Sequence, residues 1–158
     1  MVNDGLDLPA EGRFVGGEHR FPVRVYYEDT DLSGIVYHAN YLRFMERARS
    51  ELLRQAGIDQ RAAMEAGDGA YAVAKLDMRF RAPAKLDDAL VVVSRPKSVH
   101  AAHVVIHQAV MRGEAILAEA EVVAALVAPG GFPRRQPADW IARYKNIQEQ
   151  EHTVPGGG

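Results

Sequence analysis

Two aspartates lie in a short polar loop that precedes the most strongly patterned helix of the sequence. Asp29 and Asp31 are followed by Gly34 and then by His38 at the predicted helix start. The first turn of a helix has unpaired N–H groups and the positive end of the helix dipole, which can stabilise an oxyanion. A carboxylate a few residues upstream can act there as base or nucleophile. Such a loop is also ordinary turn and capping chemistry, so the residues alone leave both interpretations open.

The helix that positions this loop is predicted over residues 40–56. Its apolar side chains recur at intervals of three and four residues, which places them on one face. Asn40 is predicted to be the N-cap and Gly57 the residue just after the end. Asp59 is predicted to cap a further short helix that ends at Ala66.

The other patterned segments alternate with a period of two, which predicts strands. They are residues 22–28, 71–81, 89–95, 101–111 and 115–128, and a short closing helix is predicted over 138–147. Consecutive strands with short connections favour an antiparallel sheet, whose apolar face the long helix must cover. The predicted class is therefore α+β, with a five-stranded antiparallel sheet wrapped around one long helix.

The composition is that of one globular domain. The chain has 158 residues, a formal net charge of −2 and no cysteine, which excludes disulfides and thiolate chemistry and disfavours nucleic-acid backbone binding. We expect a flexible arm over 1–20, one domain over 21–148 and a flexible tail over 149–158. Neither a signal peptide nor a membrane-spanning run is present in these 158 residues, and we expect a cytoplasmic protein.

The run YEDTDLSGIVYHANY over residues 27–41 strongly resembles a known family. It is similar to hotdog-fold acyl-CoA thioesterases of the 4-hydroxybenzoyl-CoA thioesterase class, and most similar to the branch associated with the Tol-Pal envelope system of Gram-negative bacteria. The family pattern D-x-x-G-x-V-[YFW]-x-x-x-Y is followed by F-x-E-x-A-R, which residues 44–49 match. The first pattern is satisfied by Asp31, Gly34, Val36, Tyr37 and Tyr41. The resemblance extends over about residues 21–145.

This resemblance implies hydrolysis of acyl-CoA thioesters, with no metal or redox cofactor, since CoA is part of the substrate. The family's catalytic carboxylate falls on Asp31, which would attack the thioester carbonyl or activate a water. His38 falls where the family's oxyanion-hole N–H lies, and a further acid-base role for its ring stays open. Family members place active sites between two subunits, so we expect a homodimer or a tetramer of two dimers.

Further residues are candidates for substrate binding. An acyl pocket would be lined by Tyr27, Val36, Tyr37 and Tyr41, although core packing explains these side chains as well. Gly34 would let the backbone come close to the substrate. The phosphates of CoA need cations, and the first candidates are Arg95 and Lys97.

His103 and His107 have a spacing that binds metal on a helix, but here they lie in a predicted strand. They would be ~13 Å apart there, so we expect no metal site.

Two alternatives to hydrolysis remain. One is a non-catalytic hotdog scaffold that binds acyl carrier protein and serves envelope or lipid metabolism. The other is a hotdog dehydratase, which uses a different pair of His and acid residues. The Asp31 motif disfavours both.

Overall fold

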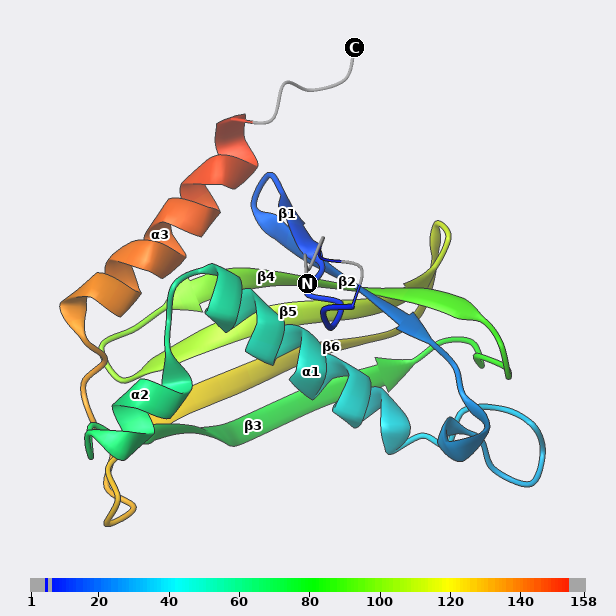
Figure 1. The fold of residues 1–158 in the computed structure, drawn as a ribbon, viewed down its shortest axis with the longest axis horizontal. Helices are drawn as coiled ribbons and strands as arrows, with labels where there is room; N and C mark the ends of the chain where they lie inside the picture. The colour runs from blue at the N-terminus through cyan, green and yellow to red at the C-terminus, as the bar shows by residue number, and fades with distance from the viewer. Residues whose placement is uncertain (1–4, 6, 154–158) are drawn as a thin grey trace.

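A six-stranded antiparallel sheet forms the framework of the part of the chain that the computed structural model describes, residue 5 and residues 7–153 (Figure 1). The order across the sheet is β1-β2-β4-β5-β6-β3. One strand more than predicted is present because the N-terminal segment folds back on itself at Gly16, whose φ is 60°. The strands are β1 (Arg13–Val15), β2 (Glu18–Arg24), β3 (Ala70–Phe80), β4 (Ala89–Val99), β5 (His103–Arg112) and β6 (Ala115–Val127).

Helix α1 (Asn40–Gln55) lies across one face of the sheet, as the periodicity predicts (Figure 1). Its apolar stripe is buried and packs mainly on β2, β4 and β5. The helix ends at a left-handed Gly57, whose φ is 82°. The Gly57 N–H donates to the Arg54 carbonyl and the Ile58 N–H donates to the Leu53 carbonyl. This pair of hydrogen bonds closes the helix end and confirms the predicted stop.

Two further helices complete the helical layer. Helix α2 (Gln60–Glu65) begins at Asp59, whose carboxylate accepts from the Ala62 N–H at 2.9 Å, so the predicted cap is confirmed. Helix α3 (Ala138–Thr153) extends the predicted closing helix and covers the end of the sheet beyond α1 (Figure 1). Its buried side chains Trp140, Tyr144 and Ile147 join a core cluster with Leu52, Leu53, Val104, Ile106 and Leu126. No helix in the described ranges is long and apolar enough to cross a membrane.

The strands β3 and β4 follow one another in sequence but do not pair. β3 is the edge strand beside β6, whereas β4 lies between β2 and β5. Because α1 packs over the other strands, the inner side of β3 is only partly covered. Val73 and Phe80 are each 52% exposed and Leu76 is 39% exposed. The alternation of β3 therefore predicts the strand, while its place in the sheet leaves its apolar face open.

The predicted flexible arm is wrong for residues 13–20. These residues form β1 and the start of β2, and the domain begins before residue 21. The alternation was masked because His19, a polar residue, takes an inward position beside Phe21. The predicted strand 22–28 is also too long, since β2 ends at Arg24 and Tyr27–Asp29 form a 3-10 turn. At the other end α3 continues to Thr153 through part of the predicted tail, and residues 154–158 lie outside the described residues.

The buried His19 makes stability sensitive to acid. Its Nε2 is 3.0 Å from the Glu11 carbonyl oxygen, and burial lowers the pKa of the ring below its ordinary value of 6.5. As the pH falls through 6.5, the unfolded chain therefore takes up a proton before the folded one, and stability decreases. We expect His19→Gln to reduce the loss of stability between pH about 7.5 and about 5, measured by urea unfolding.

The matched control for this prediction is His100→Gln, at an exposed histidine in the β4–β5 turn. It should keep the wild-type pH dependence. In His19→Gln the dependence of stability on pH should become weaker but should not disappear, because burial lowers the pKa of His107 as well. An unchanged pH dependence in His19→Gln would show that His19 does not control the loss of stability in acid.

Candidate active site

The loop between β2 and α1 is held together by the buried carboxylate of Asp29. Its Oδ1 accepts from the Asn40 side-chain amide at 2.7 Å and its Oδ2 accepts from the Tyr26 N–H at 2.8 Å. The Asp29 carbonyl oxygen accepts from the Tyr37 N–H at 2.9 Å. The prediction that Asn40 is the N-cap is wrong, because Ala39 holds that position and the Asn40 side chain turns to Asp29 instead. One acidic residue thus ties both ends of the loop to the helix start.

The carboxylate of Asp31 lies exposed on the same loop. Its Oδ1 accepts from the Ser33 N–H at 2.8 Å and from the Ser33 hydroxyl. The chain turns back at Gly34, which has a φ of 79° and donates its N–H to the Asp31 carbonyl. The hydrogen bonds from Ser33 hold the pKa of Asp31 below its ordinary value of 3.8. The group is therefore ionised at neutral pH, as a nucleophile or a general base must be.

Removing one of these hydrogen bonds should shift the titration of Asp31 in a known direction. Ser33→Ala deletes the hydroxyl donor, the largest cause of the lowered pKa. We expect the pKa of Asp31 to rise toward 3.8, because the ionised form loses a hydrogen bond. The measurement is an NMR titration of the Asp31 carboxyl carbon in the wild type and in Ser33→Ala. A pKa that stays or falls would contradict the assignment.

The start of α1 presents free backbone donors to the same loop. The N–H groups of His38 and Ala39 donate to no acceptor among the described residues. They lie at the N-terminal end of a 16-residue helix, where the dipole favours negative charge. The exposed His38 ring lies beside two aromatic rings, with centroids 4.5 Å from Tyr37 and 6.3 Å from Phe80. The backbone at this point suits an oxyanion, and the ring forms one wall beside it.

Comparison with known proteins identifies the family. A model described as the thioesterase superfamily matches residues 33–124. The chain belongs to the thioesterase superfamily. An acyl-CoA thioester hydrolase YbgC of Escherichia coli O6:H1 is 43% identical over 128 residues, which is 80% of this chain and 95% of the relative. The acyl-CoA thioesterase YbgC of Haemophilus influenzae is 42% identical over 123 residues, or 75% and 90% of the two chains.

Solved structures of this superfamily agree with the fold. The crystal structure of a probable thioesterase from Bartonella henselae superposes with a TM-score of 0.72 at 38% identity, covering 76% of this chain and 99% of the other. A 1,4-dihydroxy-2-naphthoyl-CoA thioesterase from Synechocystis gives a TM-score of 0.76 at 22% identity, over 83% and 98% of the chains. The predicted α+β hotdog fold of the thioesterase superfamily is confirmed, with six strands in place of five.

The residues expected to line an acyl pocket occupy different environments in this superfamily member. Tyr37 is 47% exposed beside His38, so it borders the site directly. Tyr27 is 84% exposed on the 3-10 turn, so its side chain points into solvent. Val36 and Tyr41 are buried, and the Tyr41 hydroxyl accepts from the Ala84 N–H at 3.0 Å. These two residues support the loop from below.

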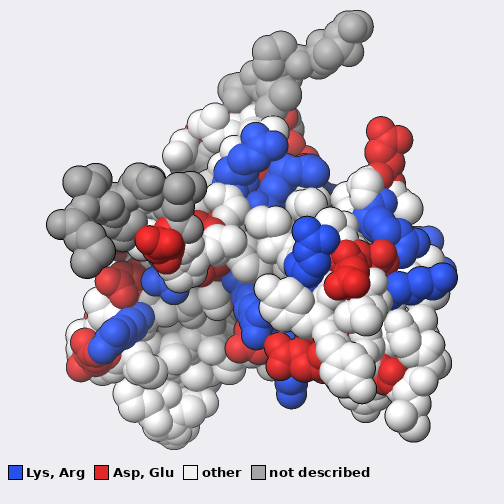
Figure 2. Space-filling model, turned by 45° about the vertical axis from the view of Figure 1, so that its right-hand side comes forward, with Lys and Arg blue, Asp and Glu red and all other residues white. Residues whose placement is uncertain are grey.

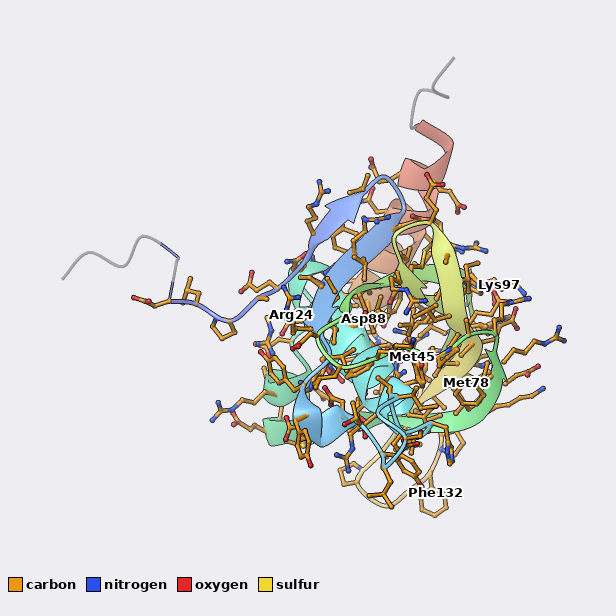
Figure 3. All side chains as sticks on the ribbon, turned by 90° about the vertical axis from the view of Figure 1, so that its right-hand side faces the viewer. Arg24, Met45, Met78, Asp88, Lys97 and Phe132 are labelled. Carbon is orange, nitrogen blue, oxygen red and sulfur yellow. The ribbon has the colours of Figure 1, made fainter. Side chains whose placement is uncertain are left out.

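The basic residues expected at the CoA phosphates lie elsewhere. Arg95 and Lys97 are on β4 and point to the outer side of the sheet, where Lys97 binds Glu121 and Arg95 Nη1 is 3.8 Å from Glu151. Figure 3 shows Lys97 on the opposite side of the sheet from Met45 of α1. Acidic and basic side chains are interspersed over the visible surface (Figure 2). The structure therefore does not bring this pair to Asp31.

Proposed function

We propose that this protein hydrolyses acyl-CoA thioesters to a free acid and CoA, with Asp31 as the reacting carboxylate. One observation carries the proposal. The ionised, exposed Asp31 and the free N–H groups of His38 and Ala39 lie on one loop that Asp29 ties to the helix. The two YbgC relatives bear names that describe acyl-CoA thioester hydrolysis, which supports this class of substrate.

In this proposal the substrate carbonyl oxygen accepts a hydrogen bond from the helix-start N–H groups. Negative charge on that oxygen is stabilised as the carbonyl carbon is attacked, and one such donor contributes about 10²–10³-fold to kcat. In one route Asp31 attacks the carbon itself, which releases CoA thiolate and leaves a mixed anhydride that water then hydrolyses. In the other route Asp31 takes a proton from the water that attacks the carbon. A single turnover in heavy-oxygen water distinguishes the routes, because only the first places label in the Asp31 carboxylate.

Both ends of the substrate have candidate binding surfaces beside this loop. Exposed apolar side chains lie along the inner side of β3, namely Val73, Leu76 and Phe80, and the Phe80 ring is next to the His38 ring. This apolar face suits the acyl chain. Lys85 is exposed and forms an isolated β-bridge with Ile35 of the loop. Because Lys85 is exposed beside this loop, it suits a CoA phosphate better than Arg95 or Lys97, which lie on the outer side of the sheet.

The test is release of CoA from a panel of acyl-CoAs, followed with a dye for free thiols. We expect hydrolysis of at least one member of the panel by the wild-type protein and the loss of that activity in Asp31→Asn. Absence of thiol release from every member would refute the proposal. Binding of acyl carrier protein without turnover would then support the scaffold alternative, and loss of water from a hydroxyacyl thioester would support a dehydratase.

The proposal includes a homodimer. β3 is an edge strand that pairs with β6 alone, and an edge that exposes Val73, Leu76 and Phe80 invites a second strand. Pairing of two β3 edges would also bring the exposed apolar faces of the two β3 strands side by side. We expect the wild-type protein to sediment as a dimer and Leu76→Asp to sediment as a monomer, because a buried charge opposes apolar association.

The matched control for the dimer is Phe132→Asp. Phe132 is 73% exposed in the loop after β6 and lies away from α1 (Figure 3). This variant should remain dimeric. A wild-type protein that sediments as a monomer, or a Leu76→Asp protein that stays dimeric, would contradict an interface at β3.

A further inference from the structure

The hydroxyl of Tyr41 links the start of α1 to the connection between β3 and β4, residues 81–88. Tyr41 is the second residue of α1 and is 3% exposed. Its hydroxyl oxygen accepts a hydrogen bond from the Ala84 N–H at 3.0 Å, and Ala84 is fully buried. A buried N–H group needs a partner, because one left unpaired destabilises the fold. Tyr41 supplies that partner from within one helical turn of the N–H groups of His38 and Ala39.

The same connection is bonded to the loop that carries Asp31. The Ala84 carbonyl accepts from the Val36 N–H at 2.9 Å, and Ile35 forms a β-bridge with the residue after Ala84. The Asp31 N–H in turn donates to the Ile35 carbonyl at 2.9 Å. A continuous series of backbone contacts therefore runs from Asp31 to Ala84, and the hydroxyl of Tyr41 joins its far end to α1.

This link is separate from the one that Asp29 makes. Asp29 holds the two ends of the loop, whereas the Asp31 turn lies between those ends. Arg112 holds the β3–β4 connection to the sheet, since its Nη1 donates to the carbonyl of the residue before Ala84 at 3.2 Å. Within the described chain, the bond to Tyr41 is the hydrogen bond that joins this connection to α1. The position of the Asp31 turn relative to the helix start therefore depends on one buried hydroxyl.

The ring of Tyr41 packs in the core independently of its hydroxyl. Its centroid lies 5.6 Å from that of Phe80 and 6.2 Å from that of Phe44, in both cases edge to face. Phenylalanine at this position can keep both contacts. Tyr41→Phe therefore removes the hydrogen bond with Ala84 and preserves the packing, so this variant isolates the role of the hydroxyl.

We propose that Tyr41 is a positioning residue for the reaction at Asp31 and acts through Ala84. In the proposed hydrolysis, the Asp31 carboxylate and the helix-start N–H groups serve the carbon and the oxygen of one thioester carbonyl. A displacement of about 1 Å between such groups can lower a rate by about 10²-fold. The Tyr41 hydroxyl fixes their separation because it ties the backbone bonded to the Asp31 turn to the helix. This inference rests on the proposed acyl-CoA hydrolysis and adds a residue to the same site.

The test is thiol release by Tyr41→Phe, at a temperature where circular dichroism shows that the variant is folded. We expect kcat to fall by about 10–100-fold, with a smaller change in KM, because the groups that bind substrate are all retained. An NMR titration should give the wild-type pKa for Asp31, since both hydrogen bonds from Ser33 remain. The loss of rate would then reflect the position of the carboxylate and not its ionisation. A variant that keeps more than half of the wild-type kcat would overturn the inference.

The matched control is Tyr144→Phe. Tyr144 is also fully buried, and its hydroxyl lies 2.8 Å from the Tyr71 hydroxyl in the core cluster that includes α3. This variant removes a buried tyrosine hydroxyl that contacts no part of the Asp31 loop, so its kcat should stay near the wild-type value. An equal fall of kcat in both variants would show a general effect of lost stability and would overturn the positioning role.

Amide hydrogen exchange separates failure of this inference from failure of the proposed hydrolysis, because it needs no substrate. In Tyr41→Phe the Ala84 and Val36 amides should exchange at least about fivefold faster than in the wild type, the effect of one lost hydrogen bond on local opening. The Tyr37 amide, which is bonded to the Asp29 carbonyl, should exchange as before. Faster exchange at Val36 would support the link from Tyr41 to the loop even if no thioester is cleaved. Wild-type exchange at Val36 would overturn it, whether or not the protein is a hydrolase.

Discussion

Replacing Asp31 by asparagine is expected to lower kcat for acyl-CoA hydrolysis by about 10²–10⁴-fold. Asparagine can accept the same hydrogen bonds from the Ser33 N–H and hydroxyl, so the turn at Gly34 is retained. What is lost is the negative charge that, in the proposed reaction, attacks the carbonyl or removes a proton from water. The measurement is thiol release under saturating substrate, together with thermal unfolding, which should remain as in the wild type because Asp31 is exposed.

The matched control for Asp31→Asn is Asp68→Asn. Asp68 is equally exposed, in the turn after α2, and lies apart from the helix start. It removes the same charge from the surface and should keep wild-type activity. If Asp31→Asn retained more than a tenth of that activity, the carboxylate would be only a turn residue, the alternative that the sequence left open.

Replacing Asp29 by alanine is expected to have the largest effect on stability. The change removes the carboxylate oxygen that accepts from the Asn40 amide and the one that accepts from the Tyr26 N–H. These two donors are then left without partners in or near the core. Hydrogen bonds to a charged acceptor contribute about 1.5–3 kcal/mol each, so we expect a loss of about 2–4 kcal/mol, or roughly 5–15 °C in Tm. Activity should fall at temperatures where the variant is still folded, because the helix start and the Asp31 turn lose their common anchor.

Two comparisons isolate the role of Asp29. Glu28→Ala removes the neighbouring, exposed carboxylate and should leave Tm and activity near wild-type values. The double variant Asp29→Ala with Asn40→Ala should be less destabilised than the sum of the two single variants, since neither partner then remains buried and unpaired. Additive effects in this cycle would show that the Asp29–Asn40 hydrogen bond does not stabilise the loop.

A partner for Asn40 could have been inferred from the sequence. Asn40 precedes Phe44 and Ala48 at helical spacing, so it lies at a buried position of the α1 stripe. A buried amide requires a hydrogen-bond partner, and the nearest polar cluster in the chain is the loop of Asp29. The preference of asparagine for N-cap positions led to the other interpretation, which the contact with Asp29 overrides.

Local pattern and family motif predicted the parts of this protein that depend on nearby residues. The periodicity of 40–56 is confirmed as α1, the glycine stop after it is confirmed, and so is the family that the resemblance indicated. Alternation predicted the strands from β3 to β6. These features depend on side-chain periodicity and turn chemistry, and both are determined by a few consecutive residues.

Only the tertiary structure decided which segments meet. Alternation shows which side chains share a face of a strand but carries no information on the neighbouring strand, so it could not place β3 at the sheet edge. For the same reason it could not show that Lys97 binds Glu121, that Tyr144 reaches Tyr71, or that residues 13–15 add a sixth strand. Contacts between distant residues arise when the whole chain buries its apolar surface together. The loop of Asp29 and Asp31 was therefore visible in the sequence, whereas the exposed apolar face of β3 and its free edge came only from the fold.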